Sequence, residues 1–140
     1  MKIITNTSEE TQDEAMKFAK TLKGGEIFGL IGDLGAGKTT FCQGIAKGLG
    51  IKQNVNSPTF VIMKQYNIEG NSNISKLIHV DAYRLDSSQG LDAIGLPEFF
   101  ARDDVVILIE WPQNIKTSLP AKTKYISFDQ DKKKRIISYN

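Results

Sequence analysis

A glycine-rich segment at residues 32–39, GDLGAGKT, constrains this chain more than any other feature of its sequence. It matches the pattern G-x-x-x-x-G-K-[ST] at every fixed position, it follows an apolar run at residues 26–31, and a helical pattern begins near Lys38. Glycines let the backbone wrap closely around phosphate oxygens, so that successive amides and the positive end of the helix point at the anion. The pattern therefore predicts a nucleotide-phosphate site in which Lys38 neutralises the β- and γ-phosphates and Thr39 offers a hydroxyl to Mg²⁺.

The alternative interpretation of this segment is a glycine-rich turn without a ligand. At ordinary residue frequencies, a chance match to the pattern in a chain of this size has a probability on the order of 1% or less. The apolar strand before the segment and the helix after it also fit a phosphate loop, so the context favours phosphate binding.

The remainder of the chain alternates between helical and extended patterns. Helices are expected over residues 7–22, 38–49 and 91–100, and strands over residues 26–31, 57–68, 74–81, 105–110, 124–128 and 135–139. The order is β-α-β-α, followed by strands and one helix, in which residues 57–68 pair with 74–81 and the last two strands form a second hairpin. This order predicts one α/β domain over residues 1–140 with a mixed, centrally parallel sheet.

Composition narrows the class of protein further. Hydrophobic residues make up 40% and charged residues 24%, which excludes a disordered or fibrous chain. The net charge of +2 is too small to indicate nucleic acid or an anionic membrane as the main partner. Cys42 is the single cysteine, so an intrachain disulfide is excluded, and no apolar run is long enough to cross a bilayer. We expect a soluble, cytoplasmic protein that does not bind membranes.

Two carboxylates follow apolar strands downstream of the phosphate loop. Asp81 ends the run KLIHVD and Glu110 ends the run VVILIE. Strand alternation places Asp81 on one face with Leu77 and His79, and Glu110 on one face with Val106 and Leu108, in each case along its own strand. A strand-end carboxylate often lies in solvent, but ligand sites in open α/β sheets lie at strand ends, so both are candidates for holding Mg²⁺ or the attacking water.

Three further residues carry weaker signals. Thr59 in the Ser-Pro-Thr segment is equally compatible with a switch that follows the γ-phosphate and with plain turn chemistry. His79, the only histidine, suits a general base, although a hydrogen-bonded histidine buried in a sheet is favoured. Trp111 directly follows Glu110 and is also explained by packing.

Four blocks in series resemble one known family. They are GDLGAGKTTF at residues 32–41, SPTF at 57–60, HVDAYRL at 79–85 and EWP at 110–112. In this order they resemble the TsaE (YjeE) family, bacterial ATPases needed for the threonylcarbamoyladenosine modification of tRNA. The resemblance spans nearly the whole chain and implies a three-layer, P-loop NTPase-like α/β domain that uses ATP and Mg²⁺.

The resemblance also implies roles for single residues. Lys38, Asp81 and Glu110 would act in catalysis, with Thr39 and Glu110 on the Mg²⁺ side and Asp81 supporting metal and water. The nucleotide would be held by Thr11, Asp33, Leu34, Gly35, Ala36, Gly37, Lys38, Thr39, Thr40, Thr59, Trp111 and Arg135.

For two of these positions the sequence itself also supports an interpretation. Thr11 lies on the inward stripe of its helix, where a lone hydroxyl without a partner would be unusual, and the family places this position near the nucleoside. Arg135 ends the basic run at residues 132–135 and roughly matches a basic family position near the nucleotide. The three lysines of that run are expected to form a solvated hairpin turn.

Members of the family act with TsaB and TsaD, so the resemblance implies these partners and tRNA adenosine 37 as the modified nucleotide. TsaD transfers the threonylcarbamoyl group, and the ATPase cycle would drive or reset the complex, with slow turnover when it is alone. The alternatives are a small P-loop kinase, a GTPase and a nucleotide-gated interaction module without hydrolysis. The Asn-Lys-x-Asp signature of GTPases is absent, and the small net charge gives direct tRNA binding little support beyond a weak contact.

Overall fold

The computed structural model describes the chain except residues 34, 57–61, 86–91, 93 and 140. In chain order the elements are β1 (Lys2–Thr5), α1 (Ser8–Ala19), β2 (Ile27–Ile31), α2 (Lys38–Gly48), β3 (Met63–Asn67), β4 (Lys76–Asp81), the 3₁₀-helix η1 (Leu96–Phe99), β5 (Val105–Glu110), the 3₁₀-helix η2 (Pro112–Ser118), β6 (Lys124–Asp131) and β7 (Lys134–Ser138). No helix among the described residues is both long enough and apolar enough to cross a membrane.

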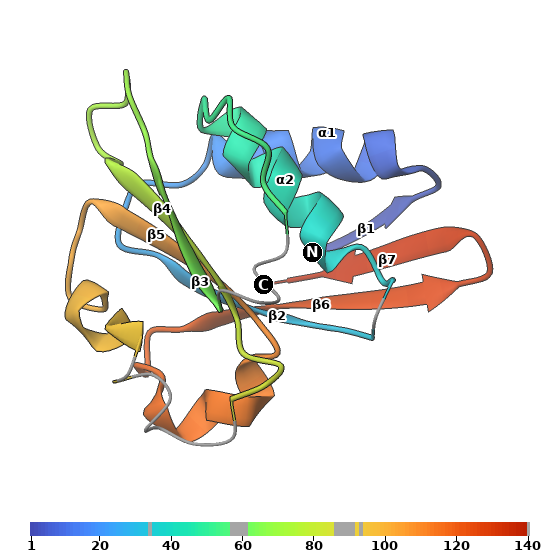
Figure 1. The fold of residues 1–140 in the computed structure, drawn as a ribbon. Helices are drawn as coiled ribbons and strands as arrows, with labels where there is room; N and C mark the ends of the chain where they lie inside the picture. Colours follow the sequence, from blue (N-terminus) through green and yellow to red (C-terminus); the bar gives the residue numbers. More distant parts are fainter. Residues whose placement is uncertain (34, 57–61, 86–91, 93, 140) are drawn as a thin grey trace.

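The strands form one sheet in the order β1-β7-β6-β2-β5-β4-β3 (Figure 1). The four central strands β6, β2, β5 and β4 run parallel, and β1, β7 and β3 pair antiparallel at the two sides. The predicted mixed, centrally parallel sheet is confirmed. Both predicted hairpins are present in the described residues, as β3 with β4 and β6 with β7.

Each face of the sheet carries its own apolar core. On one face, sheet residues such as Leu77 and Leu108 pack with Phe41 and Ile45 of α2. On the other face, sheet residues such as Ile107 pack with residues of η1 and η2. Figure 1 shows α1 and α2 together on the first face and the two 3₁₀-helices on the second. The predicted three-layer domain is confirmed, and the layer opposite α1 and α2 contains short 3₁₀-helices.

The sequence around residue 7 determines where α1 begins. The Thr7 hydroxyl accepts a hydrogen bond from the Glu10 amide at 3.1 Å, and the Glu10 carboxylate accepts one from the Asn6 amide at 3.0 Å. The first bond satisfies an amide that the first helical turn leaves without a partner, and the second holds the residue before the cap. The predicted helix start is therefore confirmed.

Small residues bring α1 and α2 into close contact. A Cβ atom on Gly44 would lie 2.5 Å from the Cβ of Ala15, and one on Gly48 would lie 2.6 Å from the Cβ of Ala19. The two glycines are one helical turn apart, as are the two alanines, so the backbones approach along a matched stripe. This contact fixes α2, and with it the phosphate loop, against α1.

The predicted helix over residues 91–100 is observed in part. Among its described residues the structure contains η1, with Pro97 in its first turn. The helix η2 was not predicted. It follows Trp111, whose φ of 59° and ψ of 48° turn the chain sharply after β5.

Strand register brings the predicted carboxylates together. Asp81 at the end of β4 is the register partner of Glu110 at the end of β5, and Glu110 is also paired with Leu30 of β2. Leu77 and Leu108, which share their faces with these carboxylates, both lie in the core beneath α2. The two predicted strand faces are therefore one face of the sheet, directed toward the start of α2.

Candidate functional site

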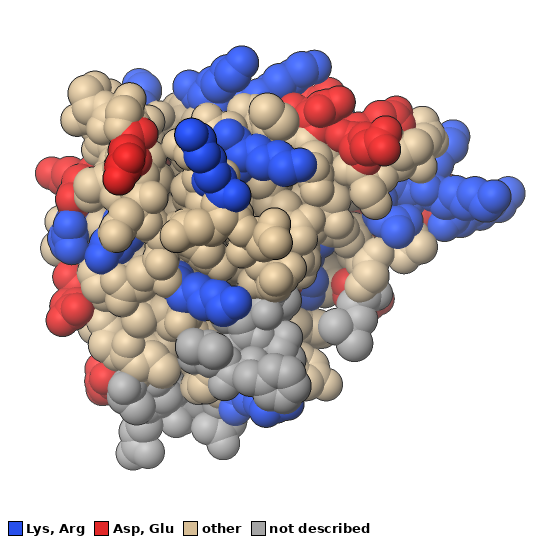
Figure 2. All heavy atoms as spheres, turned by 45° about the horizontal axis from the view of Figure 1, so that its top comes forward, with Lys and Arg blue, Asp and Glu red and all other residues tan. Residues whose placement is uncertain are grey.

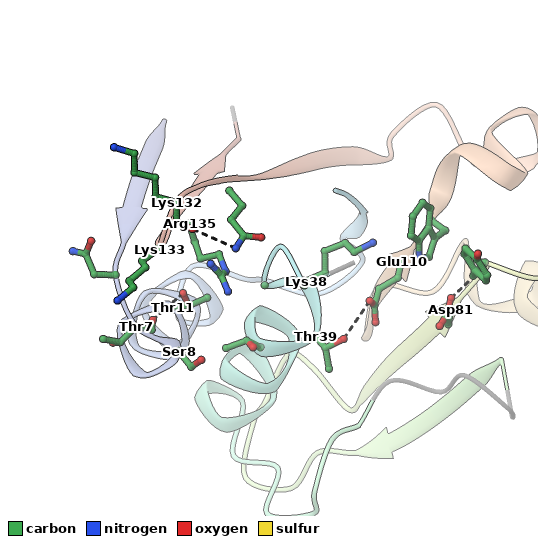
Figure 3. A pocket seen from close by; sticks show the side chains of 17 residues that line it. Thr7, Ser8, Thr11, Lys38, Thr39, Asp81, Glu110, Lys132, Lys133 and Arg135 are labelled. Carbon is green, nitrogen blue, oxygen red and sulfur yellow. Dashed lines mark hydrogen bonds between the residues drawn. The ribbon is translucent and has the colours of Figure 1, made fainter. Parts of the chain in front are cut away.

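A cleft of about 830 Å³ lies over the amino end of α2 and the carboxyl ends of β4 and β5 (Figure 3). Its lining residues are Asn6, Thr7, Ser8, Thr11, Gly35, Gly37, Lys38, Thr39, Thr40, Asp81, Tyr83, Glu110, Trp111, Gln130, Lys132, Lys133 and Arg135. Four of them are lysine or arginine and two are carboxylates. The cleft thus combines an excess of positive charge with a small acidic part.

The described part of the glycine-rich loop has two glycines in left-handed backbone conformations. Gly35 has φ 82° and Gly37 has φ 103°, in the left-handed region that other residues rarely adopt. A Cβ on Gly35 would meet nothing within 4 Å, so the backbone angle rather than crowding accounts for glycine there. The loop then turns directly into α2 and leaves the first amides of the helix facing the cleft.

Lys38, the first residue of α2, is 4% exposed and lies at the centre of the site. Its Nζ donates to the Gly32 carbonyl at 2.6 Å and lies 3.9 Å from the centroid of the Trp111 ring. Burial lowers the pKa of the Lys38 ammonium, although the nearby carboxylates of Glu110 and Asp81 oppose this effect. This cation is therefore held by a carbonyl dipole and an aromatic face at the wall of the cleft.

Thr39 and Glu110 connect the helix to the sheet. The Thr39 hydroxyl donates to Glu110 Oε1 at 3.3 Å (Figure 3). The other carboxylate oxygen, Oε2, lies 2.7 Å from Nε2 of His79 on β4. Glu110 is 4% exposed and His79 is 0% exposed, so this carboxylate is held from two sides in a nearly dry environment.

Asp81 and two aromatic residues complete this end of the cleft. Asp81 Oδ1 accepts a hydrogen bond from the Tyr83 amide at 3.0 Å. The rings of Tyr83 and Trp111 meet edge to face with centroids 5.1 Å apart. The structure therefore places Asp81, from the block at 79–85, beside Glu110 and Trp111, from the block at 110–112.

The opposite end of the cleft is formed by the start of α1 and the β6–β7 turn (Figure 3). Thr11 lines it and is 1% exposed. Its hydroxyl lies 2.6 Å from the Thr5 hydroxyl and donates to the Thr7 carbonyl at 3.2 Å. The buried hydroxyl therefore has partners within the chain itself and does not need a ligand to satisfy it. A role for Thr11 near a nucleoside stays a prediction.

Basic side chains border the same end. Arg135 lies beside the loop, with its Cδ 3.7 Å from the position of a Cβ on Gly37. Lys132 and Lys133 are exposed, as expected for a hairpin turn, and they also line the cleft. Figure 2 shows Lys and Arg side chains gathered at the right-hand edge, where the β6–β7 turn projects in Figure 1. This end of the cleft suits an anionic or polar ligand group.

The remaining predicted site residues lie elsewhere. Asp33 and Ala36 line a smaller cavity of about 430 Å³ next to β6 and not the main cleft. The predictions for Leu34 and Thr59 fall outside the described residues. The structure thus gathers most of the predicted residues into one cleft and places two in a smaller cavity, which shares Gln130 and Lys132 with that cleft.

Sequence reasoning did not assign several residues that line the cleft: Asn6, Thr7, Ser8, Tyr83, Gln130, Lys132 and Lys133. Thr7 was identified only as a helix cap, and Tyr83 only as part of a sequence block. For Asn6, Thr7 and Ser8 the sequence did contain a signal. They lie at the amino end of α1, where polar residues are close to the free amides of the helix. For Lys132 and Lys133 no local signal distinguishes a turn at a cleft from a turn in solvent.

Oxygen donors dominate the acidic end of the cleft. The Thr39 hydroxyl and the Glu110 carboxylate are within hydrogen-bond distance, with Asp81 on the neighbouring strand. Hydroxyl, carboxylate and water oxygens are the ligands that Mg²⁺ prefers. The donor set at this end of the cleft therefore fits a magnesium ion.

Comparison with known proteins gives consistent matches. Residues 5–137 match the family model described as "Threonylcarbamoyl adenosine biosynthesis protein TsaE". A relative from Bacillus subtilis, named tRNA threonylcarbamoyladenosine biosynthesis protein TsaE, is 44% identical over 83% of this chain and 69% of its own length. One of the same name from Haemophilus influenzae is 38% identical over 71% of this chain and 60% of its own length. The crystal structure of Bacillus subtilis YdiB is 36% identical, with a TM-score of 0.78 over 99% of this chain and 83% of that one.

Proposed function

The chain belongs to the TsaE family of threonylcarbamoyl adenosine biosynthesis proteins, and on that premise we propose that it binds and hydrolyses Mg-ATP in tRNA threonylcarbamoyladenosine biosynthesis. The observation that carries this proposal is the position of Lys38. Its ammonium lies between a glycine-rich loop with two left-handed glycines and the carboxylate that accepts from Thr39. A cation, an amide nest and an acidic oxygen donor in one cleft suit a metal-bound triphosphate.

In this proposal the two ends of the cleft bind different parts of the nucleotide. The phosphates lie over the loop and the amino end of α2, where free amides and Lys38 face them. The nucleoside lies toward Thr11 and the β6–β7 turn. Lys132 and Lys133 add positive potential there, which attracts the polyanion before specific contacts form.

Thr39 and Glu110 would hold Mg²⁺ against the phosphate oxygens. The bound ion neutralises charge that develops on the phosphates during transfer. The Glu110 carboxylate keeps its orientation through its hydrogen bonds, and Asp81 adds negative charge where an attacking water would lie. Most of the catalysis would then come from positioning and electrostatics.

Partners would complete the cycle. From the family, we propose that TsaB and TsaD act with this chain and that TsaD, not this chain, transfers the threonylcarbamoyl group. Among the described residues, the arginine that lines the cleft is Arg135, at the end away from the carboxylates. We expect slow hydrolysis by the isolated chain and faster hydrolysis with both partners. The reason is that a positive group to stabilise the charge on the transferred γ-phosphate would have to come from a partner protein.

Mg-ATP calorimetry with Lys38→Ala tests the proposal. The wild-type chain should bind Mg-ATP, and the variant should bind it at least about a hundredfold more weakly, because several charge-assisted contacts to phosphate depend on the ammonium. Lys47→Ala is a matched control on the same helix. Lys47 is exposed and donates to Gln12 at 2.7 Å, away from the cleft, so its loss should leave the affinity unchanged.

Hydrolysis is measured in the same series, in a single turnover with and without TsaB and TsaD. Undiminished hydrolysis by Lys38→Ala would defeat the assignment. Binding without any cleavage, even with both partners, would favour the nucleotide-gated module. A phosphorylated nucleoside or sugar acceptor would identify a kinase, and GTP that displaces ATP preferentially would identify a GTPase.

A further inference from the structure

We propose that His79 is a positioning residue that fixes the Glu110 carboxylate, so that the oxygen facing Thr39 is aligned for the metal ion. This inference rests on the proposed function and deepens it. It assigns a task to a buried polar residue that the phosphate loop and the strand-end carboxylates do not by themselves explain.

The contact is specific and completely buried. His79 on β4 is 0% exposed, and its Nε2 lies 2.7 Å from Glu110 Oε2 on β5. His79 is in register with Leu108, so it reaches diagonally along the neighbouring strand to Glu110, two residues further on. Side chains on the same face of adjacent strands are close enough for such a diagonal contact.

The hydrogen bond defines which ring nitrogen carries the proton. A carboxylate oxygen accepts hydrogen bonds, so Nε2 of His79 must donate. The second nitrogen, Nδ1, is buried and has no hydrogen-bond partner among the described residues. Leaving a buried polar atom without a partner costs free energy, and packing alone would favour an apolar side chain here. A need for the Nε2 donor would account for a histidine at this buried position.

The hydrogen bond to His79 gives the two carboxylate oxygens of Glu110 different contacts. Oε2 is held by His79, which leaves Oε1 directed at the Thr39 hydroxyl at 3.3 Å. Glu110 has little contact with solvent, so water would not replace a missing donor. Without His79 the carboxylate would lose its fixed orientation, and we expect weaker metal binding with little change in the contacts to phosphate.

The first measurement is the Mg²⁺ concentration required for half-maximal ATP binding by His79→Leu and His79→Gln. The leucine removes the donor and should raise this concentration about tenfold or more, as loss of a hydrogen bond to a metal ligand typically does. The glutamine carries an amide that reaches the Nε2 position and should restore most of the wild-type value. ADP affinity in EDTA should be unchanged in both variants.

Cys42→Ala is the matched control. Cys42 is completely buried, and its Sγ lies within 4.8 Å of the ligand atoms of His79 and Glu110. Its truncation disturbs packing at the same place without removing the bond to Glu110. It should lower the thermal midpoint and leave the Mg²⁺ requirement unchanged. If His79→Leu does not fold, His79→Asn takes its place, because its shorter amide does not reach Glu110.

Nitrogen-15 NMR of the nucleotide-free chain tests the contact itself. The His79 ring should carry its proton on Nε2, and Glu110→Gln should shift that resonance. An Nδ1-protonated ring, or a His79→Leu variant with the wild-type Mg²⁺ requirement, would overturn the inference while Mg-ATP binding persists. If the wild-type chain does not bind Mg-ATP, the proposed function fails, whatever the NMR result.

Discussion

The parallel strands β4 and β5 have polar or charged residues at or next to both of their ends, and the burial of these residues differs between the two ends. We call the side of the sheet where the parallel strands begin the amino edge, and the side where they end the carboxyl edge. At the carboxyl edge, Glu110 is 4% exposed and its partner His79 is 0% exposed. At the amino edge, the ion pair of Arg102 with Asp104 leaves 42% and 44% of the two side chains exposed. The charged residues next to the start of β5 are thus exposed to solvent, whereas those at the carboxyl ends of β4 and β5 are buried.

The amino edge uses its charges to close turns. Glu26, just before β2, accepts from the amides of Lys23 and Gly24, both at 2.7 Å. Asp104, just before β5, accepts from the Ser75 hydroxyl at 2.5 Å and from the Arg102 guanidinium at 2.7 Å. Each contact ties a connecting segment to the start of a strand.

The difference in burial suggests a distinction between charges that stabilise turns and charges that would bind the proposed ligand. Solvated ion pairs and turn contacts cost little to form and contribute little each. Buried charges carry a desolvation penalty of several kcal/mol per ion, which their mutual attraction offsets only in part. A group of them around a glycine-rich loop is therefore expected where a bound ligand supplies the missing charge, and the following substitutions test this distinction.

The largest effect is expected for Glu110→Gln. Mg²⁺-dependent ATP hydrolysis should fall by at least about a hundredfold, because the carboxylate orients metal and water. ADP affinity without metal should change much less. Single-turnover hydrolysis and calorimetry give the two quantities.

The same substitution at the other edge, Glu26→Gln, is the control. It weakens two turn contacts, so the urea midpoint should fall while hydrolysis stays at the wild-type rate. Loss of hydrolysis in Glu26→Gln, with the chain still folded, would contradict the contrast between the edges.

The second largest effect is expected for Gly24→Ala at the amino edge, where the added methyl group would clash with the backbone. A Cβ on Gly24 would lie 2.2 Å from the Asp103 carbonyl oxygen, and Gly24 has φ 105°. Gly24→Ala should lower the free energy of unfolding by about 3 kcal/mol, measured by urea denaturation. Gly25→Ala meets nothing closer than 3.6 Å and should lower it by about 1 kcal/mol, from its φ of 89° alone. Both variants should bind Mg-ATP with wild-type affinity, and a weakened affinity would argue against separate roles for the edges.

The smallest effect is expected for Asp104→Asn. Hydrogen bonds from Arg102 and Ser75 lower the pKa of Asp104 well below its ordinary value. A carboxyl group with a lowered pKa stabilises the fold above its unfolded pKa, near 3.9, and loses this contribution as the pH falls toward the folded pKa. The variant should have a slightly lower urea midpoint at pH 7, and the difference from wild type should shrink below about pH 4. A constant difference across this range would show that the carboxyl charge is not responsible.

Features fixed by neighbouring residues were predicted well from the sequence. The cap at Thr7, the start of α2 at Lys38 and the strand ending at Glu110 all follow from patterns a few residues long. Propensity, capping and alternation act over such distances, so most elements and both hairpins could be anticipated. The short helix η2 was missed because it depends on the left-handed turn at Trp111.

The site was anticipated less evenly. Lys38, Thr39 and Glu110 were placed together because a motif and a strand end have fixed positions in an open α/β sheet. Thr11 was expected to need a partner for its inward-facing hydroxyl, and Thr5 on β1 supplies one that the sequence did not identify. That contact depends on the pairing of β1 at the edge of the sheet, which no local pattern reveals.

By itself, the sequence determined a phosphate loop between a buried strand and a helix, and two acidic strand ends downstream of it. These depend on backbone angles and periodicity, which a few adjacent residues control. Only the tertiary structure decided that β4 lies beside β5 in the register that brings His79 to Glu110, and that the β6–β7 turn reaches the cleft. Such contacts join residues far apart in the chain, and they form only when the whole sheet is packed against its helices.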